Sequence, residues 1–576
     1  MSRRIALFAL FLAVCLWGYS KTFKPKTERQ GPFFEDVAEK SGIHFHHFNG
    51  IRSHLLPEDY GSGVCFADID GTGWDDLYFV NSHPMNSTLK IPGRSSRNAL
   101  YRNRGNGMFV NITDTANVAG RGLGMGCLFG DFGNTGREDL LVTTYGKGNI
   151  FYRNQGHKRF VEETASAGLG GDLRWGSGAC AADYDGDGRL DIDVPHYAAF
   201  SHKLRGEKTS AREGFIVPAA LNPFSFPPAG NSLYRNEGAV KFKNMTSTLN
   251  LANISGRGLQ CLFTDFNGSG LPDIYFADDM SPDAFFVNSG HGTFENDTSK
   301  VDLGDISGSM GVTAGDLDGQ GQPDLLVTQW MTSAPRLYVN TCNHKQGGHR
   351  GRIPCLRFSD QSEDAGLDET TFGLVGWGVA FLDYDNDGCL DLLIVNGSTE
   401  EDANQQDRVL IPQRMKLFQG HCDGTFTDVS DSAGPAFARP INGRGLAIAD
   451  YDHDGRMDAA INVNGGRAIL LHNIVHNSNH WLELRLRGVK TNRDAVGARV
   501  DILLADGRKQ TRWVTAGGSY LSENSLLIHF GCGRFSQVEL LKIRWPRPSR
   551  LVQIFHNVPA DRLWDLSEGG FLRISQ

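Results

Sequence analysis

The stretch Asp183-Tyr184-Asp185-Gly186-Asp187-Gly188-Arg189-Leu190-Asp191 decides the fold, because its pattern returns along the chain. Acidic or polar residues stand at positions 1, 3, 5 and 9, Gly stands at position 6, and an apolar run follows. Copies spaced by about 50 to 80 residues are typical of a repeat architecture. The seven copies begin at Asp68, Asp131, Asp183, Asp265, Asp316, Asp383 and Asp450.

Each of these Asp loops lies in a unit of about four short strand signals. A Gly-rich entry precedes the loop, and a run such as Leu77-Tyr78-Phe79-Val80 follows it. A further strand signal comes next, as in Leu100-Tyr101-Arg102-Asn103. The last strand signal opens with Phe, at Phe109, Phe160, Phe242, Phe294, Phe358 and Phe426. Four-stranded units repeated in this way are typical of β-propeller blades.

The two ends of the array indicate a closed ring. No Phe segment follows the last loop at Asp450, whereas Phe34-Glu35-Asp36-Val37 precedes the first loop. The N-terminal strand would therefore complete the last blade, which removes an exposed sheet edge. The sequence predicts an all-β protein whose residues 31–475 form a seven-bladed β-propeller with calcium loops, followed by a small all-β domain at residues 480–570.

The Asp loops are predicted to bind calcium. Ca²⁺ takes roughly six to eight oxygen ligands, which short Asp side chains in a tight turn can supply together with backbone carbonyls. Gly at position 6 allows the sharp turn. The candidate ligands are Asp68, Asp70, Thr72 and Asp76; Asp131 and Asp139; Asp183, Asp185, Asp187 and Asp191; Asp265, Asn267, Ser269 and Asp273; Asp316, Asp318, Gln320 and Asp324; Asp383, Asp385, Asp387 and Asp391; and Asp450, Asp452, Asp454 and Asp458.

The loops differ in charge, and charge tunes calcium affinity. The loops at Asp183, Asp383 and Asp450 keep all four acids, those at Asp68 and Asp316 keep three, and the loop at Asp265 keeps two. The Asp131 loop has Gly at position 3 and is expected to bind most weakly, with an Asp/Gly turn that holds no metal as the alternative. The ions are expected to be structural, since carboxylates packed in one turn repel each other without a cation.

Residues 1–20 are predicted to be an export signal, with an uncleaved membrane anchor as the alternative. Two Arg residues precede an apolar run from Ile5 to Tyr19, which is short for a membrane span. A secreted, extracellular or periplasmic protein is expected. The net charge of −9 argues against a nucleic-acid partner.

The cysteines leave the redox state partly open. Four of them precede Asp loops and are expected to be small buried residues on core strands, namely Cys65, Cys127, Cys180 and Cys261. Cys342 and Cys355 flank a Gly/His/Arg-rich stretch and are candidates for a disulfide in an oxidising compartment.

The motifs now support a family resemblance. The Asp loops with their Gly entries resemble the FG-GAP/VCBS repeats of integrin α-subunit propellers. The C-terminal region resembles the ASPIC/UnbV domain, through Asn492-Arg493-Asp494-Ala495-Val496-Gly497-Ala498-Arg499, Gly517-Gly518-Ser519-Tyr520-Leu521-Ser522, His529-Phe530-Gly531-Cys532-Gly533 and Trp545-Pro546. Cys532 departs from the usual Leu of a Gly-Leu-Gly motif.

Together these parts have the layout of the cartilage acidic protein family and its bacterial relatives. The resemblance implies extracellular calcium binding and adhesion or matrix contact, and it implies no established reaction.

No catalytic signature accompanies these motifs, since the chain lacks HExxH, GxSxG and P-loop patterns. The sequence therefore predicts a non-enzymatic binding or adhesion module for an extracellular protein or glycan. The alternative is a calcium-dependent carbohydrate-active enzyme, similar to a polysaccharide lyase. Insertions at residues 196–232, 343–354 and 398–415 are the candidate partner-binding loops, because binding residues favour loops on a rigid scaffold.

Overall fold

The computed structural model describes residues 31–48, 50–91, 96–201, 209–212, 214–251, 256–304, 306–342, 356–402 and 409–575. Within these ranges the α-helices are single turns, namely α2 (Thr113–Ala116), α3 (Asp368–Thr371) and α4 (Pro435–Ala438). None of the helices in these ranges has the length and apolar character needed to cross a membrane. The predicted all-β class is confirmed.

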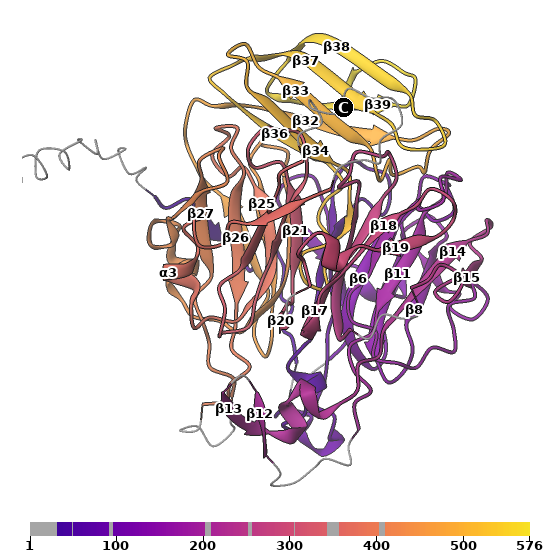
Figure 1. Ribbon diagram of the computed structural model, residues 1–576, viewed down its shortest axis with the longest axis vertical. Coiled ribbons are helices and arrows are strands. Elements are labelled where there is room, and N and C mark those ends of the chain that lie inside the picture. The colour runs from indigo at the N-terminus through magenta and orange to yellow at the C-terminus, as the bar shows by residue number, and fades with distance from the viewer. Residues whose placement is uncertain are drawn as a thin grey trace, which may run out of the picture.

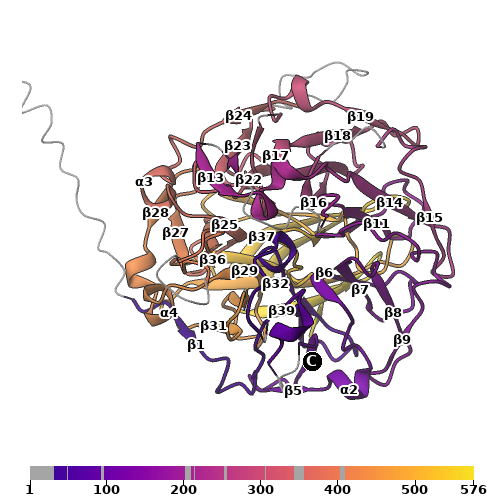
Figure 2. The ribbon, with the colours of Figure 1, turned by 90° about the horizontal axis from the view of Figure 1, so that it is seen from below.

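Seven antiparallel sheets follow one another around a ring in the described part of residues 34–473 (Figure 2). An Asp loop joins the first strand of each sheet to the second. The strands, sheet by sheet, are β2 (Val64–Ala67), β3 (Asp76–Phe79), β4 (Ala99–Asn103), β5 (Phe109–Asn111); β6 (Leu123–Gly130), β7 (Asp139–Tyr145), β8 (Ile150–Asn154), β9 (Phe160–Glu162); β10 (Cys180–Ala182), β11 (Asp191–Pro195), β14 (Asn231–Asn236), β15 (Phe242–Asn244); β16 (Gly258–Thr264), β17 (Asp273–Pro282), β18 (Ala284–Asn288), β19 (Phe294–Asn296); β21 (Val312–Gly315), β22 (Asp324–Val327), β23 (Arg336–Asn340), β24 (Phe358–Asp360); β25 (Gly376–Leu382), β26 (Asp391–Asn396), β27 (Lys416–Gly420), β28 (Phe426–Asp428); and β29 (Gly443–Ala449), β30 (Asp458–Val463), β31 (Ile469–Asn473), β1 (Phe34–Asp36).

The ring closes through its N-terminal strand. β1 pairs antiparallel with β31, with Phe34 opposite Asn473 and Asp36 opposite Leu471. The Phe34 ring is fully buried and lies 6.0 Å from that of Phe437. The predicted completion of the last sheet by the N-terminal strand is confirmed.

The C-terminal region forms two further sheets that stand on one face of the ring (Figure 1). The hairpin of β12 (Thr209–Arg212) and β13 (Phe215–Pro218) lies at the opposite end. The strands of the two sheets, in spatial order, are β36 (Ile528–Gly533), β32 (His480–Arg487), β39 (Arg562–Ser567) and β40 (Arg573–Ile574); and β34 (Lys509–Trp513), β33 (Arg499–Leu503), β37 (Gln537–Arg544) and β38 (Val552–Pro559).

One segment of this region, residues 516–525, runs through the centre of the ring, and we call it the axial segment. It bonds to the first strand of every sheet, and its own short strand β35 (Ala516–Gly517) pairs with β10. The other hydrogen-bonded pairs are Val64 with Ser522, Cys127 with Leu521, Gln260 with Leu521, Val312 with Ser519, Val379 with Ser519, and Ile448 with Asn524. The region from 480 to 570 therefore shares its core with the propeller instead of standing apart from it.

The four cysteines before the Asp loops are buried, as expected, and they also form two disulfide bonds. Cys65 is bonded to Cys127, and Cys180 is bonded to Cys261. Each bond joins the first strands of two neighbouring sheets, because the repeat places cysteines at equivalent positions that face each other. Another disulfide joins Cys389 to Cys422. Cys355, the predicted partner of Cys342, lies outside the described residues.

Candidate metal centres on one face of the ring

The first Asp of each loop holds the turn together. Asp183 accepts the backbone N–H of Asp187 at 2.9 Å through Oδ1 and that of Gly188 at 2.7 Å through Oδ2. Gly188 has a φ of 88°, a left-handed conformation that explains the Gly at position 6. Asp383 and Asp450 accept the equivalent pair of N–H groups. The loop backbone thus curls around the carboxylates.

The last Asp of each loop anchors it to the third strand of the sheet. Asp191 Oδ1 accepts the backbone N–H of Asn236 at 2.7 Å, while Oδ2 accepts that of Tyr184 at 3.2 Å. All seven final aspartates accept an N–H from the equivalent strand position. Their carboxylates are therefore fixed toward the loop interior.

In three loops the acidic oxygens converge. Candidate ligand atoms lie within 4.8 Å of one another in the groups Asp183, Asp185 and Asp191; Asp383, Asp385 and Asp391; Asp450, Asp452 and Asp454; and Asp452, Asp458 and His472. These are the loops that the sequence identifies as complete. In the other four loops, the described residues form no such group.

Several of these carboxylates have an oxygen that a cation would satisfy. Buried oxygens without a hydrogen-bond partner among the described residues occur on Asp70, Asp139, Asp185, Asp316, Asp452 and Asp458. Buried polar atoms are almost always partnered in proteins. The residues present therefore fit Ca²⁺, which takes only oxygen ligands and tolerates irregular geometry.

The raised pKa values of the loop carboxyl groups also favour a bound cation. Burial, together with the charge of Asp187, raises the pKa of Asp183 to about 7. Burial and the charge of Asp387 raise the pKa of Asp383 to about 7. Without a cation, these carboxyl groups resist ionisation because each lies out of water beside other acids.

In the loops with fewer acidic residues, the carboxylates contact a protein cation or a neutral polar side chain. Arg102 Nε lies 2.8 Å from Asp70, and Arg153 Nε lies 3.4 Å from Asp139. In the Asp316 loop the side-chain amide of Gln320 donates to Asp318 at 2.6 Å. Arg235 also contacts Asp185 in a complete loop, at 2.7 Å. The loops at Asp383 and Asp450 have Gln419 and His472 at this strand position.

All seven loops face the C-terminal sheets. Arg485 Nη2 donates to the Gly73 carbonyl at 2.7 Å, and the Asp131 N–H donates to Asp494 at 2.7 Å. Arg508 donates to the Asp387 carbonyl at 2.8 Å. The Asp183 and Asp265 loops share a cavity with β33, and the Gly455 carbonyl contacts His529. The Asp loops thus form the surface on which the C-terminal sheets pack.

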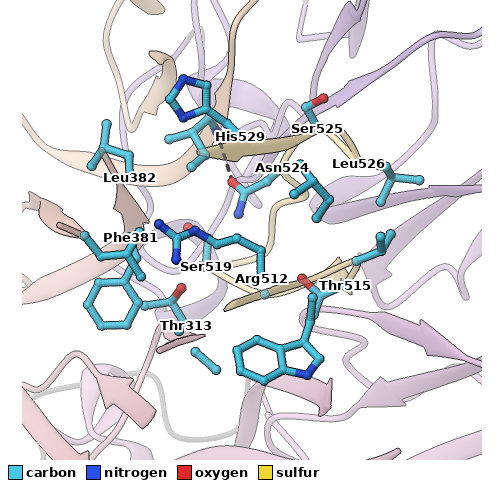
Figure 3. Close-up of a pocket in the computed structure, with 18 of the residues that line it drawn as sticks. Thr313, Phe381, Leu382, Arg512, Thr515, Ser519, Asn524, Ser525, Leu526 and His529 are labelled. Carbon is cyan, nitrogen blue, oxygen red and sulfur yellow. Dashed lines mark hydrogen bonds between the residues drawn. The ribbon is translucent and has the colours of Figure 1, made fainter. Parts of the chain in front are cut away.

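A cavity of about 130 Å³ marks this seam (Figure 3). Arg512 of β34 extends across it toward Phe381 of β25, and Ser519 of the axial segment also lines the cavity (Figure 3). Arg512 is partly buried, and the charges of Asp383 and Asp316 act on its guanidinium. Its guanidinium therefore compensates part of the loop charge from the side of the C-terminal sheets.

One set of residues escapes sequence reasoning. The Asn that ends the third strand donates its side-chain amide to the loop of the preceding sheet, as Asn154 does to the Ile69 carbonyl at 2.9 Å. The recurring Asn at the end of motifs such as Leu100-Tyr101-Arg102-Asn103 is the sequence feature that marks these residues. It indicates the end of a strand, but it does not predict the bond to the neighbouring loop.

Comparisons with known proteins agree with this architecture. Residues 488–571 match the ASPIC and UnbV family, and residues 68–142, 134–192 and 265–327 match the FG-GAP-like repeat. Cartilage acidic protein 1 of Mus musculus is 23% identical over 525 residues, which cover 87% of this chain and 73% of that protein. The Homo sapiens protein is 23% identical over 525 residues, with 87% and 72% covered.

Among solved structures, the BP39L lectin from Burkholderia pseudomallei aligns with 12% identity and a TM-score of 0.42, over 73% of this chain and 97% of the lectin.

The resemblance that the motifs indicate is confirmed: the chain carries FG-GAP-like repeats and an ASPIC and UnbV segment, and it is similar to cartilage acidic protein 1 along most of its length.

Proposed function

We propose that this chain is an exported, calcium-binding β-propeller that serves as a binding or adhesion module for an extracellular protein or glycan. The observation that carries the proposal is the convergence of carboxylates in the three complete loops, with buried oxygens on Asp185, Asp452 and Asp458 that have no hydrogen-bond partner among the described residues. Calcium would hold each loop in its turn and neutralise the face beneath the C-terminal sheets. The ions are then structural, and the rigid ring presents the binding surface.

Three disulfides among the described cysteines support an oxidising, extracellular location. Two of them fasten neighbouring sheets, which suits a scaffold that must persist outside the cell. The similarity to cartilage acidic protein 1 supports the same location. Adhesion or matrix contact is the role that this location and the repeats favour.

Elemental analysis of the full chain after dialysis against calcium-free buffer tests the proposal. We expect at least two tightly held calcium ions, in the Asp383 and Asp450 loops, and a fall in the melting temperature after chelation. Asp383→Asn should lose one ion, whereas Asp423→Asn, in an exposed turn, is the matched control. A calcium-free protein whose melting temperature is indifferent to chelator would overturn the proposal.

Binding without turnover is the version that the buried tyrosines favour. Tyr60 and Tyr197 donate their hydroxyls to Asp279, and burial beside this carboxylate raises the pKa of both phenols. Both phenols therefore stay protonated at neutral pH and supply no general base, so a lyase would need another group for that role. Incubation with uronic-acid polysaccharides should therefore yield no unsaturated products, and their appearance would favour the lyase alternative.

A further inference from the structure

His472 sets the Asp450 loop apart from the other six Asp loops. It stands on β31, at the last but one position of the third strand of its sheet. Three other sheets have Arg102, Arg153 and Arg235 at this position, and the remaining three have Val or Gln. A neutral imidazole offers a nitrogen lone pair to a metal, which none of these other side chains does. The Asp450 loop is therefore the one with a nitrogen ligand at this position.

The imidazole and two carboxylates converge at a spacing that suits a metal ion. One ligand atom each from Asp452, Asp458 and His472 lies within 4.8 Å of the others. His472 Nδ1 is 3.3 Å from Asp458 Oδ1 and 3.6 Å from Asp452 Oδ2. Charge-assisted hydrogen bonds are shorter, at about 2.7–2.9 Å. Two ligands that each lie about 2.0–2.1 Å from a tetrahedral zinc ion are about 3.3 Å apart.

Both carboxylates also have an oxygen without a partner. Oδ1 of Asp452 and Oδ2 of Asp458 are buried and accept no hydrogen bond from the described residues. The Asp458 side chain is 0% exposed, so an unsatisfied charge there is costly. The side chains of Asp452 and His472 are each 21% exposed, which leaves the group open to solvent on one side. An ion can reach the group from that side and satisfy both carboxylates.

The Asp183 loop shows what a protein cation does at the equivalent position. Arg235 Nε lies 2.7 Å from Asp185 Oδ2 there. A guanidinium has donors and no acceptor, so it neutralises the loop and offers a metal no ligand. In both loops the acid at position 5 pairs with the arginine at position 7. The two complete loops thus share their acids and their internal ion pair, and they differ in the nitrogen ligand of His472.

The donor set decides which metal is preferred. Calcium takes oxygen ligands, whereas imidazole suits zinc and other transition metals. Two carboxylates and one imidazole make three protein ligands, the number at zinc sites that keep a fourth position for water. Asp452 and Asp458 also belong to the predicted calcium ligands of this loop. Zinc and calcium would therefore compete for the same carboxylates.

We propose that Asp452, Asp458 and His472 form a zinc site, in which zinc displaces calcium from the Asp450 loop. The proposal goes beyond calcium binding, and it rests on the proposed function for the calcium ion that zinc displaces. Since β31 pairs with β1, zinc would bind in the sheet that closes the ring.

The test uses the untagged full chain, loaded with calcium and then incubated with a small excess of zinc chloride. After gel filtration, elemental analysis should find one zinc ion per chain and one calcium ion fewer than before. X-ray absorption at the zinc edge should show one imidazole ligand. Melting temperatures measured in calcium establish that every variant is folded.

Three substitutions locate the zinc. His472→Gln copies the residue at the equivalent position beside the Asp383 loop, and it should keep its calcium. It should weaken zinc binding at least about tenfold, since even residues that only orient a metal ligand contribute that much. Gln419 Nε2 donates to Asp385 at 3.2 Å, so Gln419→His should create a second zinc site there. His556→Gln, on an exposed position of β38, is the matched control and should bind zinc as the wild type does.

The outcomes separate this zinc site from the calcium scaffold. Calcium-loaded protein that binds no zinc, or binds it equally well after His472→Gln, would overturn the zinc site and leave the scaffold standing. Zinc that binds without release of calcium would refute the displacement. A chain that binds zinc through His472 and never holds calcium would contradict the scaffold and not the zinc ligands.

Discussion

The side-chain amide of Asn103 donates a 2.8 Å hydrogen bond to the backbone carbonyl of Tyr451, in the loop of the last sheet. The same bond links five further sheets to the preceding loop, from Asn154, Asn236, Asn288, Asn340 and Asn473. Gly420 stands at this position in the remaining sheet. Six of the seven sheets are therefore hydrogen-bonded to the Asp loop of the preceding sheet, and the Asn103 bond spans the closure of the ring.

Replacing this amide should loosen the ring. Asn103→Ala removes bonds to the carbonyls of Tyr451 and Asp75 in a buried place, and we expect a loss of about 2–4 kcal/mol in the free energy of unfolding. Urea denaturation measures it. Asn106→Ala, in the exposed turn nearby, should change stability by less than about 0.5 kcal/mol; equal losses would contradict a special role for Asn103.

The loops should fill in order of charge and of competition from protein cations. In calcium titrations, Asp385→Asn should remove one tight site, because this carboxylate belongs to a converging group. Thr135→Ala, in the Asp131 loop where Arg153 lies beside Asp139, should leave the number of tight sites unchanged. Isothermal titration calorimetry counts the sites, and an equal loss in both variants would refute the order.

Stability without calcium should fall as the pH rises. The pKa of Asp183, Asp383 and Asp458 is raised from 3.8 to about 7 in the folded protein, chiefly by burial. The folded state therefore holds more protons than the unfolded state between these values. The contribution of these groups to the free energy of unfolding is complete below about pH 4 and is lost as the pH rises through about 7.

Thermal melts of dialysed protein between about pH 5 and 7.5 measure this effect, and the melting temperature should decrease across the range. Calcium needs the ionised carboxylates, so its addition should release protons and remove the decrease. A calcium-free melting temperature that increases with pH would show that other groups dominate.

The axial segment should make the ring and the C-terminal sheets unfold together. Tyr520 is fully buried, with its ring centre 4.8 Å from that of Trp377. Tyr520→Ala should cost about 3–5 kcal/mol, as expected for a buried aromatic side chain. Calorimetry should show one transition that shifts downward, whereas Phe571→Ala, with Phe571 82% exposed, should leave it in place. Two separate transitions would contradict shared folding.

Periodic features were predictable from the sequence because each repeat reports the same local structure. The nine-residue pattern from Asp183 to Asp191 predicted the loops, and the Phe34 segment predicted the closing strand. The charge count also singled out the three loops whose carboxylates converge, since the converging oxygens come from the acids themselves.

Contacts between distant segments were not predictable in this way. The pairing of Cys65 with Cys127 depends on how neighbouring sheets are rotated, which no single repeat encodes. The position of Gly517 to Ser525 inside the ring depends on its width. Arg212 and Glu400 lie far apart in sequence, and only the fold of two insertions brings them to the wall of one pocket.

The axial segment also sets the order in which the protein can mature. A nascent chain emerges N-terminus first, so β1 cannot pair with β31 until residue 473 has been made. The hydrogen bonds between the seven first strands and the axial segment cannot form until residues 516–525 have been made. Such late, long-range pairing slows folding and leaves strand edges open during synthesis. Completion of the native state therefore follows the synthesis of almost the whole polypeptide.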